Sequence, residues 1–257
     1  MKAAEVSAPM RPSRLAGIRI ICGREFTASF DSPIAATTVI AFLLVASSLY
    51  MNEFFLIGQL EMNSFFERLP LLFALFLPAL SMRAWSEEKS SRTFELLVTL
   101  PYHSSTLVIG KWLASTLLLV LALAASTPIV AMLISLGDPD LARIAAGYLA
   151  ALLLGAWLLA IGSFLSALTQ DQVVAFVATA FLIFVLISTG DARVVAIIDG
   201  WAPSLGLGHW MQQTLSALPH YERMIAGLVD TGALLYFGGG TAAALFATAH
   251  IVARERS

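Results

Sequence analysis

Long apolar runs restrict the fold of this sequence more than any other feature. A helix of about 20 predominantly apolar residues crosses the hydrocarbon core of a bilayer. Because 58% of the residues are hydrophobic and only 12% are charged, where soluble domains carry about 25% charged residues, we predict an all-α integral membrane protein. Six transmembrane helices are expected, at residues 33–51, 69–83, 112–136, 144–168, 173–189 and 231–253.

The second of these segments is short for a span. It requires either a thinner bilayer or burial of Glu67 and Arg68 within the protein. These two charges either line a translocation path or lie at the membrane interface where the span begins. Charge inside a bilayer is costly, which favours the interface.

The distribution of Lys and Arg predicts the orientation of the spans. If the N-terminus lies inside, eleven of the fifteen basic residues fall on the inner side. The other four are Arg68, Arg143, Arg193 and Arg223. Short cytoplasmic segments carry an excess of basic residues, so both termini are predicted to be cytoplasmic, together with the polar stretch 83–111.

The chain divides into a short N-terminus and one membrane domain. Residues 1–13 are predicted to be flexible, and residues 14–257 to form a single transmembrane domain with an outer segment at about 190–230. Residues 14–30 predict an amphipathic helix that lies along the bilayer surface. Its apolar face is expected to carry Leu15, Ile18, Cys22 and Phe26.

The polar stretch is predicted to contain a short helix at about residues 86–100. Ser86 is a favourable N-cap residue, because its hydroxyl accepts from free backbone amides. Glu87 and Glu88 then fall in the first turn, where the helix dipole favours negative charge. Pro101 is expected to end the helix, since the residue before a proline is disfavoured in the α region.

This short helix is expected to be amphipathic. Phe94, Leu97 and Val98 share one face at helical spacing. Glu88 and Arg92 stand four residues apart in the favourable order for an ion pair. The pattern indicates a helix at the membrane surface that turns its charges toward a partner.

Small and aromatic residues suggest how the spans pack. Small residues recur every four positions, which lets helices approach closely in lipid. The two sets are Gly147, Ala151 and Gly155 in the fourth span, and Gly239, Ala243 and Ala247 in the sixth. Tryptophan is enriched where a span meets water, and the residues expected there are Trp85, Trp112 and Trp201.

The sequence indicates no catalytic, metal or nucleotide site. The single Cys22 cannot form an internal disulfide, and none of the four histidines has metal-ligand spacing. Gly110 and Lys111 lack the upstream glycine and the following Ser or Thr of a phosphate loop. The net charge of −2 gives no indication of nucleic-acid binding. We therefore expect no enzyme activity and no cofactor on this chain.

Four short stretches of the polar region resemble the signature of type-2 ABC transporter permeases. They are residues 87–89, 93–97, 100–101 and 110–111. The pattern is most similar to the gliding-motility and nitrous-oxide-reductase-maturation branch of that family. Arg92 departs from it, because the family has glycine at this position.

The resemblance implies a permease of the bacterial plasma membrane, with an elbow helix before its first span. Such a permease pairs with a second chain, identical or similar, and docks a cytoplasmic ATPase that holds ATP and Mg. The resemblance assigns the coupling role to Glu87, Glu88, Arg92, Thr93, Glu95, Leu97 and Pro101. Asp171, in the inner turn before the fifth span, is either a second ATPase contact or a polar turn residue.

Three functions remain open at this point. The first is an export permease driven by the ATPase. The second is a subunit that relays ATPase motion to an extracytoplasmic partner, through residues 190–230, without moving a substrate. The third is an ATP-independent transporter or scaffold, which the small number of charges within the spans disfavours.

Overall fold

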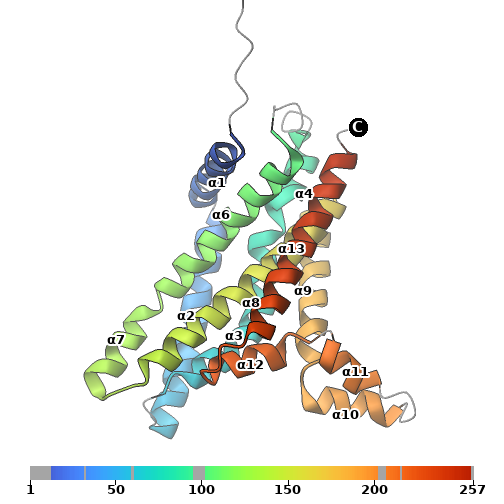
Figure 1. Ribbon diagram of the computed structural model, residues 1–257. Coiled ribbons are helices and arrows are strands. Elements are labelled where there is room, and N and C mark those ends of the chain that lie inside the picture. The colour runs from blue at the N-terminus through green and yellow to red at the C-terminus, as the bar shows by residue number, and fades with distance from the viewer. Residues whose placement is uncertain are drawn as a thin grey trace, which may run out of the picture.

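The structure is a computed structural model that describes residues 13–31, 33–58, 61–94, 102–201, 207–214 and 216–255. All secondary structure in these ranges is helical (Figure 1), which confirms the predicted all-α fold. The helices are α1 (Arg14–Asp31), α2 (Pro33–Ile57), α3 (Asn63–Ser81), α4 (Arg83–Ser90), α6 (Ser104–Ala124), α7 (Thr127–Leu136), α8 (Leu141–Leu168), α9 (Gln172–Ser188), α10 (Ala192–Trp201), α11 (Leu207–Thr214), α12 (Leu218–Ile225) and α13 (Thr231–Arg254). Residues 1–12, most of the segment predicted to be flexible, lie outside the described ranges.

Five helical segments of the described chain are long and apolar enough to cross a membrane. They are Pro33–Leu56, Asn63–Ser90, Ser104–Leu136, Leu141–Leu168 and Thr231–Arg254. A sixth span exists if the pair Gln172–Ser188 and Arg193–Gly200, bent by 86°, counts as one. The expectation of an integral membrane protein is confirmed, with five or six spans.

The second span is longer than predicted. It starts at Asn63 and continues through α4 to Ser90, over 28 residues. The charges near its start do not need burial, because the Nε and Nη2 atoms of Arg68 donate to Glu53 Oε2 on α2 at 2.9 and 2.6 Å. Glu67 and Arg68 are both exposed in the isolated chain, as expected for an interface position.

Two spans are each built from two helices. Ala125 and Ser126 form a turn between α6 and α7, and Pro128 follows in the first turn of α7. Proline has no backbone N–H to donate and therefore fits a helix start better than a helix interior. Met82 forms the turn between α3 and α4, one turn after Pro78.

The molecule has two distinct ends in Figure 1. One end, here called the α4 end, brings together α1, α4 and the C-terminal part of α13. The other, here called the α12 end, carries α7, α10, α11 and α12. Lys89 and Lys111 form ion pairs at the α4 end, whereas Arg143 and Arg223 form theirs at the α12 end. The basic residues therefore separate as the sequence predicts.

Helix α8 is the centre of the fold and packs against α3, α4, α6, α9, α12 and α13. Glycines on α8 permit two of these contacts. A Cβ atom added at Gly147 would overlap the Phe66 ring on α3, and one at Gly155 would overlap Leu119 on α6. The predicted contact face of the fourth span is confirmed at both glycines.

The predicted contact face of the sixth span is wrong by one residue. Gly239 has open space around its Cα, whereas Gly240 lies against the indole of Trp157 on α8. Gly239 and Ala243 are exposed in the isolated chain. Three adjacent glycines, at 238–240, left the register of the face ambiguous in the sequence.

Replacing Gly147 by Ala should lower the stability of the folded chain by about 1–3 kcal/mol, because Phe66 is fully enclosed and cannot yield to the new methyl group. The matched control is Gly239→Ala, which adds the same methyl group in open space. That control should be neutral or should gain up to about 1 kcal/mol from helix propensity. Thermal unfolding in detergent compares the two. Equal effects would show that the α3–α8 contact is not close-packed.

Candidate functional site

Trp85 anchors α4 in a hydrophobic cluster at the α4 end. The indole is fully buried, and its cluster draws on α1, α6, α8 and α13 through Ile21, Leu107, Val108, Ala167 and Val252. Trp85 Nε1 donates to Ser163 Oγ on α8 at 3.0 Å. The prediction that Trp85 belongs to an interfacial belt is therefore wrong. Trp112 is also half-buried, and it donates to Ala156 O at 2.9 Å.

Ser166 of α8 connects to the start of α4 by three hydrogen bonds. Its Oγ accepts from the backbone N–H groups of Trp85 and Ser86, both at 3.1 Å, and donates to Met82 O at 2.8 Å. The first amides of a helix have no partner within that helix. Ser166 supplies that partner from a neighbouring span, so α4 and α8 are joined at the turn that separates α3 from α4.

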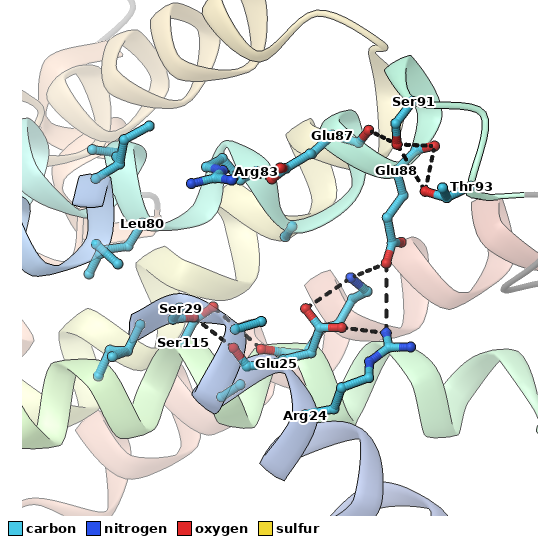
Figure 2. Close-up of a pocket in the computed structure, with 18 residues that line it drawn as sticks. Arg24, Glu25, Ser29, Leu80, Arg83, Glu87, Glu88, Ser91, Thr93 and Ser115 are labelled. Carbon is cyan, nitrogen blue, oxygen red and sulfur yellow. Dashed lines mark hydrogen bonds and ion pairs between the residues drawn. The ribbon is translucent and has the colours of Figure 1, made fainter. Parts of the chain in front are cut away.

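Four charged side chains lie together where α1, α4 and α6 meet, and Figure 2 labels three of them, Arg24, Glu25 and Glu88. We call Arg24, Glu25, Glu88 and Lys111 the charge cluster. Lys111 Nζ donates to Glu88 Oε1 at 2.8 Å and lies 3.3 Å from Glu25 Oε2, and its side chain is only 4% exposed. Arg24 Nη2 lies 2.5 Å from Glu25 Oε1 and 3.8 Å from Glu88 Oε1. Two positive and two negative charges thus compensate one another around the buried Lys111, while Arg24 is 51% exposed.

The electrostatics of the cluster favour the ionised form of Glu25. Burial alone would raise the pKa of the Glu25 carboxyl, but the charges and hydrogen bonds of Lys111 and Arg24 outweigh burial and lower that pKa below its usual value. Lys111 Nζ also lies 5.1 Å from the centre of the Trp85 ring, within the range of a cation–π contact. Lys111 therefore joins the charge cluster to the buried tryptophan.

Lys89 adds two further polar contacts to α4. Its Nζ donates to Ala167 O at the end of α8, at 2.5 Å, and to Glu255 Oε1 after α13, at 2.6 Å. The Lys89 side chain is 8% exposed. Through Ser166, Lys111 and Lys89, α4 is tied to three other helices by polar contacts.

The solvent-facing side of α4 carries Glu87. Its two carboxylate oxygens accept from Arg83 Nε and Nη2, both at 2.6 Å, within the same helix. Its side chain is 42% exposed, whereas that of Glu88 is 17% exposed. The two adjacent glutamates thus differ in environment, with Glu87 toward solvent and Glu88 toward the interior.

Helix α4 does not follow the predicted range of 86–100. It begins at Arg83, so Ser86 is an internal residue, and its hydroxyl donates to Met82 O instead of capping the helix. It ends at Ser90, because Arg92 adopts a left-handed backbone conformation with φ of 58° that cannot continue a helix. The expected Glu88–Arg92 pair is replaced by Glu88–Lys111.

The remaining predicted coupling residues divide into two groups. Thr93 is exposed beside the end of α4, where its hydroxyl lies 2.9 Å from Ser91 Oγ. Glu95, Leu97 and Pro101 lie outside the described residues. Asp171 is the N-cap of α9, where its Oδ1 accepts from the N–H groups of Val173 and Val174 at 2.7 and 3.3 Å. Its carboxylate is exposed and has a structural role as a cap.

The N-terminal helix contacts the site through small residues. A Cβ atom at Gly110 of α6 would lie 2.7 Å from Ile21 of α1, and one at Gly17 of α1 would lie 3.0 Å from Thr106. The packed face of α1 is therefore Gly17 and Ile21, and Leu15, predicted to lie on the apolar face, is 80% exposed. Close α1–α6 packing brings Glu25 to Lys111.

Two of the histidines, His103 and His220, have separate local roles. His103 caps α6, accepting from Ser105 N, and His220 stacks on Tyr236 at 4.6 Å between ring centres. Among the residues with described positions, no three His, Cys, Asp or Glu side chains are placed to hold a metal ion.

A family model described as "ABC-2 family transporter protein" matches residues 23–220, well over half of the chain. The matched region begins within α1 and includes the charge cluster, α4 and Ser166. No curated protein was found to be similar to the chain.

Proposed function

The chain belongs to the ABC-2 transporter family, and from this premise we propose that it is an export permease driven by a separate cytoplasmic ATPase subunit. The family match makes the chain a permease subunit of an ABC transporter and a multi-pass membrane protein. ATP and Mg would be bound by the partner chain. The coupling to ATP hydrolysis, the direction of transport, the bacterial plasma membrane and the cytoplasmic termini belong to the proposal.

The observation that carries this proposal is the way α4 is joined to the spans. Ser166 connects it to α8, Lys111 connects it to α6, and Lys89 connects it to α8 and to the end of α13. Since these contacts join α4 to several helices, a force applied to α4 from outside is transmitted to several spans at once. Rigid-body movement of packed helices is a common form of switching transition.

The side available to an ATPase is the solvent-facing side of α4, which carries Glu87. Glu87, Arg92 and Thr93 are the predicted coupling residues on this side, and we propose that they contact the partner, with Glu95, Leu97 and Pro101 in the segment that follows. Glu88 has a different role in this proposal, because it holds α4 to Lys111 and Arg24. Asp171 would be a peripheral contact.

A second permease chain is the other partner of the proposed complex. Helix α9 exposes an apolar stripe, with Val173, Val177, Phe181 and Phe184 each more than half exposed. The neighbouring α3 exposes Leu71 and Leu75. These stripes, on the second and fifth spans of the sequence prediction, suit a dimer interface within the membrane or contact with lipid tails.

Cross-linking tests the ATPase partner and its contact point. Thr93→Cys in a Cys22→Ala background should cross-link to a co-purifying ATPase subunit, because Thr93 is exposed beside the end of α4. Asp138→Cys, exposed at the α12 end, should not. Cross-linking of that ATPase from Asp138 but not from Thr93 would reverse the proposed orientation, and the absence of any ATPase would favour an ATP-independent function.

A further inference from the structure

A cavity of about 640 Å³ opens beside the charge cluster (Figure 2). It is enclosed by α1, the start of α2, the end of α3, α4 and α6. Its volume falls in the range of about 300–1,000 Å³ that is typical of small-molecule sites. The cavity lies where the chain passes from α1, which ends at Asp31, into the first span, which begins at Pro33.

The lining of the cavity is amphipathic. Its charged part comes from α1, α4 and the start of α6. Its apolar part comes from the spans themselves, through Ile34 and Ala35 of α2, Leu80 of α3 and Leu118 of α6. A ligand that fills such a space must combine a polar group with an apolar one. An amphiphile at the edge of the bilayer meets that requirement.

The charged part of the lining is balanced. It contains three cations, Arg24, Arg83 and Lys111, and three carboxylates, Glu25, Glu87 and Glu88. An anionic headgroup would have to compete with carboxylates that already bind these cations. A zwitterionic headgroup brings a positive and a negative group together, and so can bind among paired charges without leaving one of them uncompensated.

Glu88 indicates which positive group fits. Its Oε1 accepts from Lys111, but its Oε2 is enclosed and has no hydrogen-bond partner among the described residues. A buried acceptor without a hydrogen-bond partner is unfavourable, and more so when it is charged. A primary ammonium donates three hydrogen bonds and can relieve this cost after a small rotation of the carboxylate, whereas a quaternary ammonium has no N–H to donate.

We propose that this cavity binds a phospholipid with an ethanolamine headgroup. The ammonium lies toward Glu87 and Glu88, the phosphate lies toward Arg24 and Arg83, and the first part of an acyl chain lies along Ile34 and Leu118. The site depends on the cavity and its charges and not on an ATPase, although Glu87 lines the cavity and is also a proposed ATPase contact.

Native mass spectrometry of the purified full chain tests this site. The chain is offered equal amounts of phosphatidylethanolamine, phosphatidylcholine and phosphatidylglycerol with identical acyl chains. We expect the ethanolamine lipid to be retained several-fold over the other two. Equal retention of all three lipids, or preference for the anionic one, would overturn the proposal.

Two tryptophan substitutions on α1 provide the matched comparison. Ala28→Trp places an indole in the cavity from an exposed position and should abolish the ethanolamine preference. Leu15→Trp adds an indole at another exposed position of the same helix, away from the cavity, and should leave the preference unchanged. If Ala28→Trp retains the lipid as wild type does, with an unchanged melting temperature, the cavity is not the site.

A soluble competitor separates a lipid from a free headgroup compound. Glycerophosphoethanolamine has the same polar groups without acyl chains, and it should not displace the bound lipid because it cannot use the apolar part of the lining. Its displacement of the lipid would contradict a lipid site and would indicate a soluble ligand.

Discussion

Replacing Lys111 by Met should destabilise the folded protein by about 3–5 kcal/mol, because breaking a buried ion pair leaves its partners uncompensated. Lys111 is 4% exposed and lies within hydrogen-bonding or ion-pair distance of Glu88 and Glu25. Without it, two carboxylates would face the single positive charge of Arg24. Thermal unfolding in detergent, together with the yield of folded protein, measures the loss.

Two variants control this prediction. Arg68→Met removes an exposed pair with Glu53 at the α12 end and should cost less than about 1 kcal/mol. Lys111→Met/Glu88→Gln removes one charge of each sign and leaves Arg24 paired with Glu25, so it should recover part of the stability. A double variant no more stable than Lys111→Met would show that the two charges are not coupled.

Trp85→Ala should cost about 3–5 kcal/mol, the usual range for truncating a fully buried aromatic side chain. The substitution empties the centre of the cluster formed with Ile21, Val108 and Val252. It also removes the donor to Ser163 and the ring beneath Lys111. We expect α1, α4 and α13 to loosen together, which limited proteolysis at the α4 end would detect.

A graded series separates packing from hydrogen bonding at this position. Trp85→Phe keeps most of the apolar volume and loses the indole N–H, so it should cost less than Trp85→Ala. Trp210→Ala, at a side chain that is 59% exposed, should change stability by less than about 0.5 kcal/mol. Equal effects of Trp85→Ala and Trp210→Ala in detergent would contradict the buried position of Trp85.

The spans and the grouping of charges were predictable because they depend on composition over long windows. Apolar length predicted the membrane helices, and the excess of Lys and Arg predicted which residues gather at one end. It was harder to predict which residues of a helix form its contact face, as Gly239 and Gly240 show. Both fit the spacing rule, and only their contact with Trp157 distinguishes them.

The environment of Trp85 was not predictable from its position in a polar stretch. Tryptophan has an apolar body and one polar N–H, so it suits an interfacial belt and a satisfied core position equally well. The choice depends on Ser163, 78 residues away in the sequence. No local pattern contains that information.

The structure explains several residues of the permease signature, which lies between residues 87 and 111. Glu88 and Lys111, in separate parts of the pattern, are hydrogen-bonded to each other. Gly110 faces α1, where a side chain would collide with Ile21. Arg92, which replaces the glycine of the pattern, has a positive φ that glycine adopts without strain. Several residues of the signature therefore hold α4 in place. Glu87 differs from them, because its carboxylate faces solvent.

The proposal that α4 couples this permease to an ATPase is tested most directly by the ATP hydrolysis of the complex purified through a tag on this chain. Glu87→Arg reverses an exposed charge beside Arg83 and leaves the four residues of the charge cluster unchanged. Glu53→Arg makes the same reversal beside Arg68 at the α12 end. We predict that Glu87→Arg lowers the co-purifying ATPase activity several-fold with an unchanged melting temperature, and that Glu53→Arg does not. A complex without ATPase activity, or equal activity in both variants, would contradict coupling through α4.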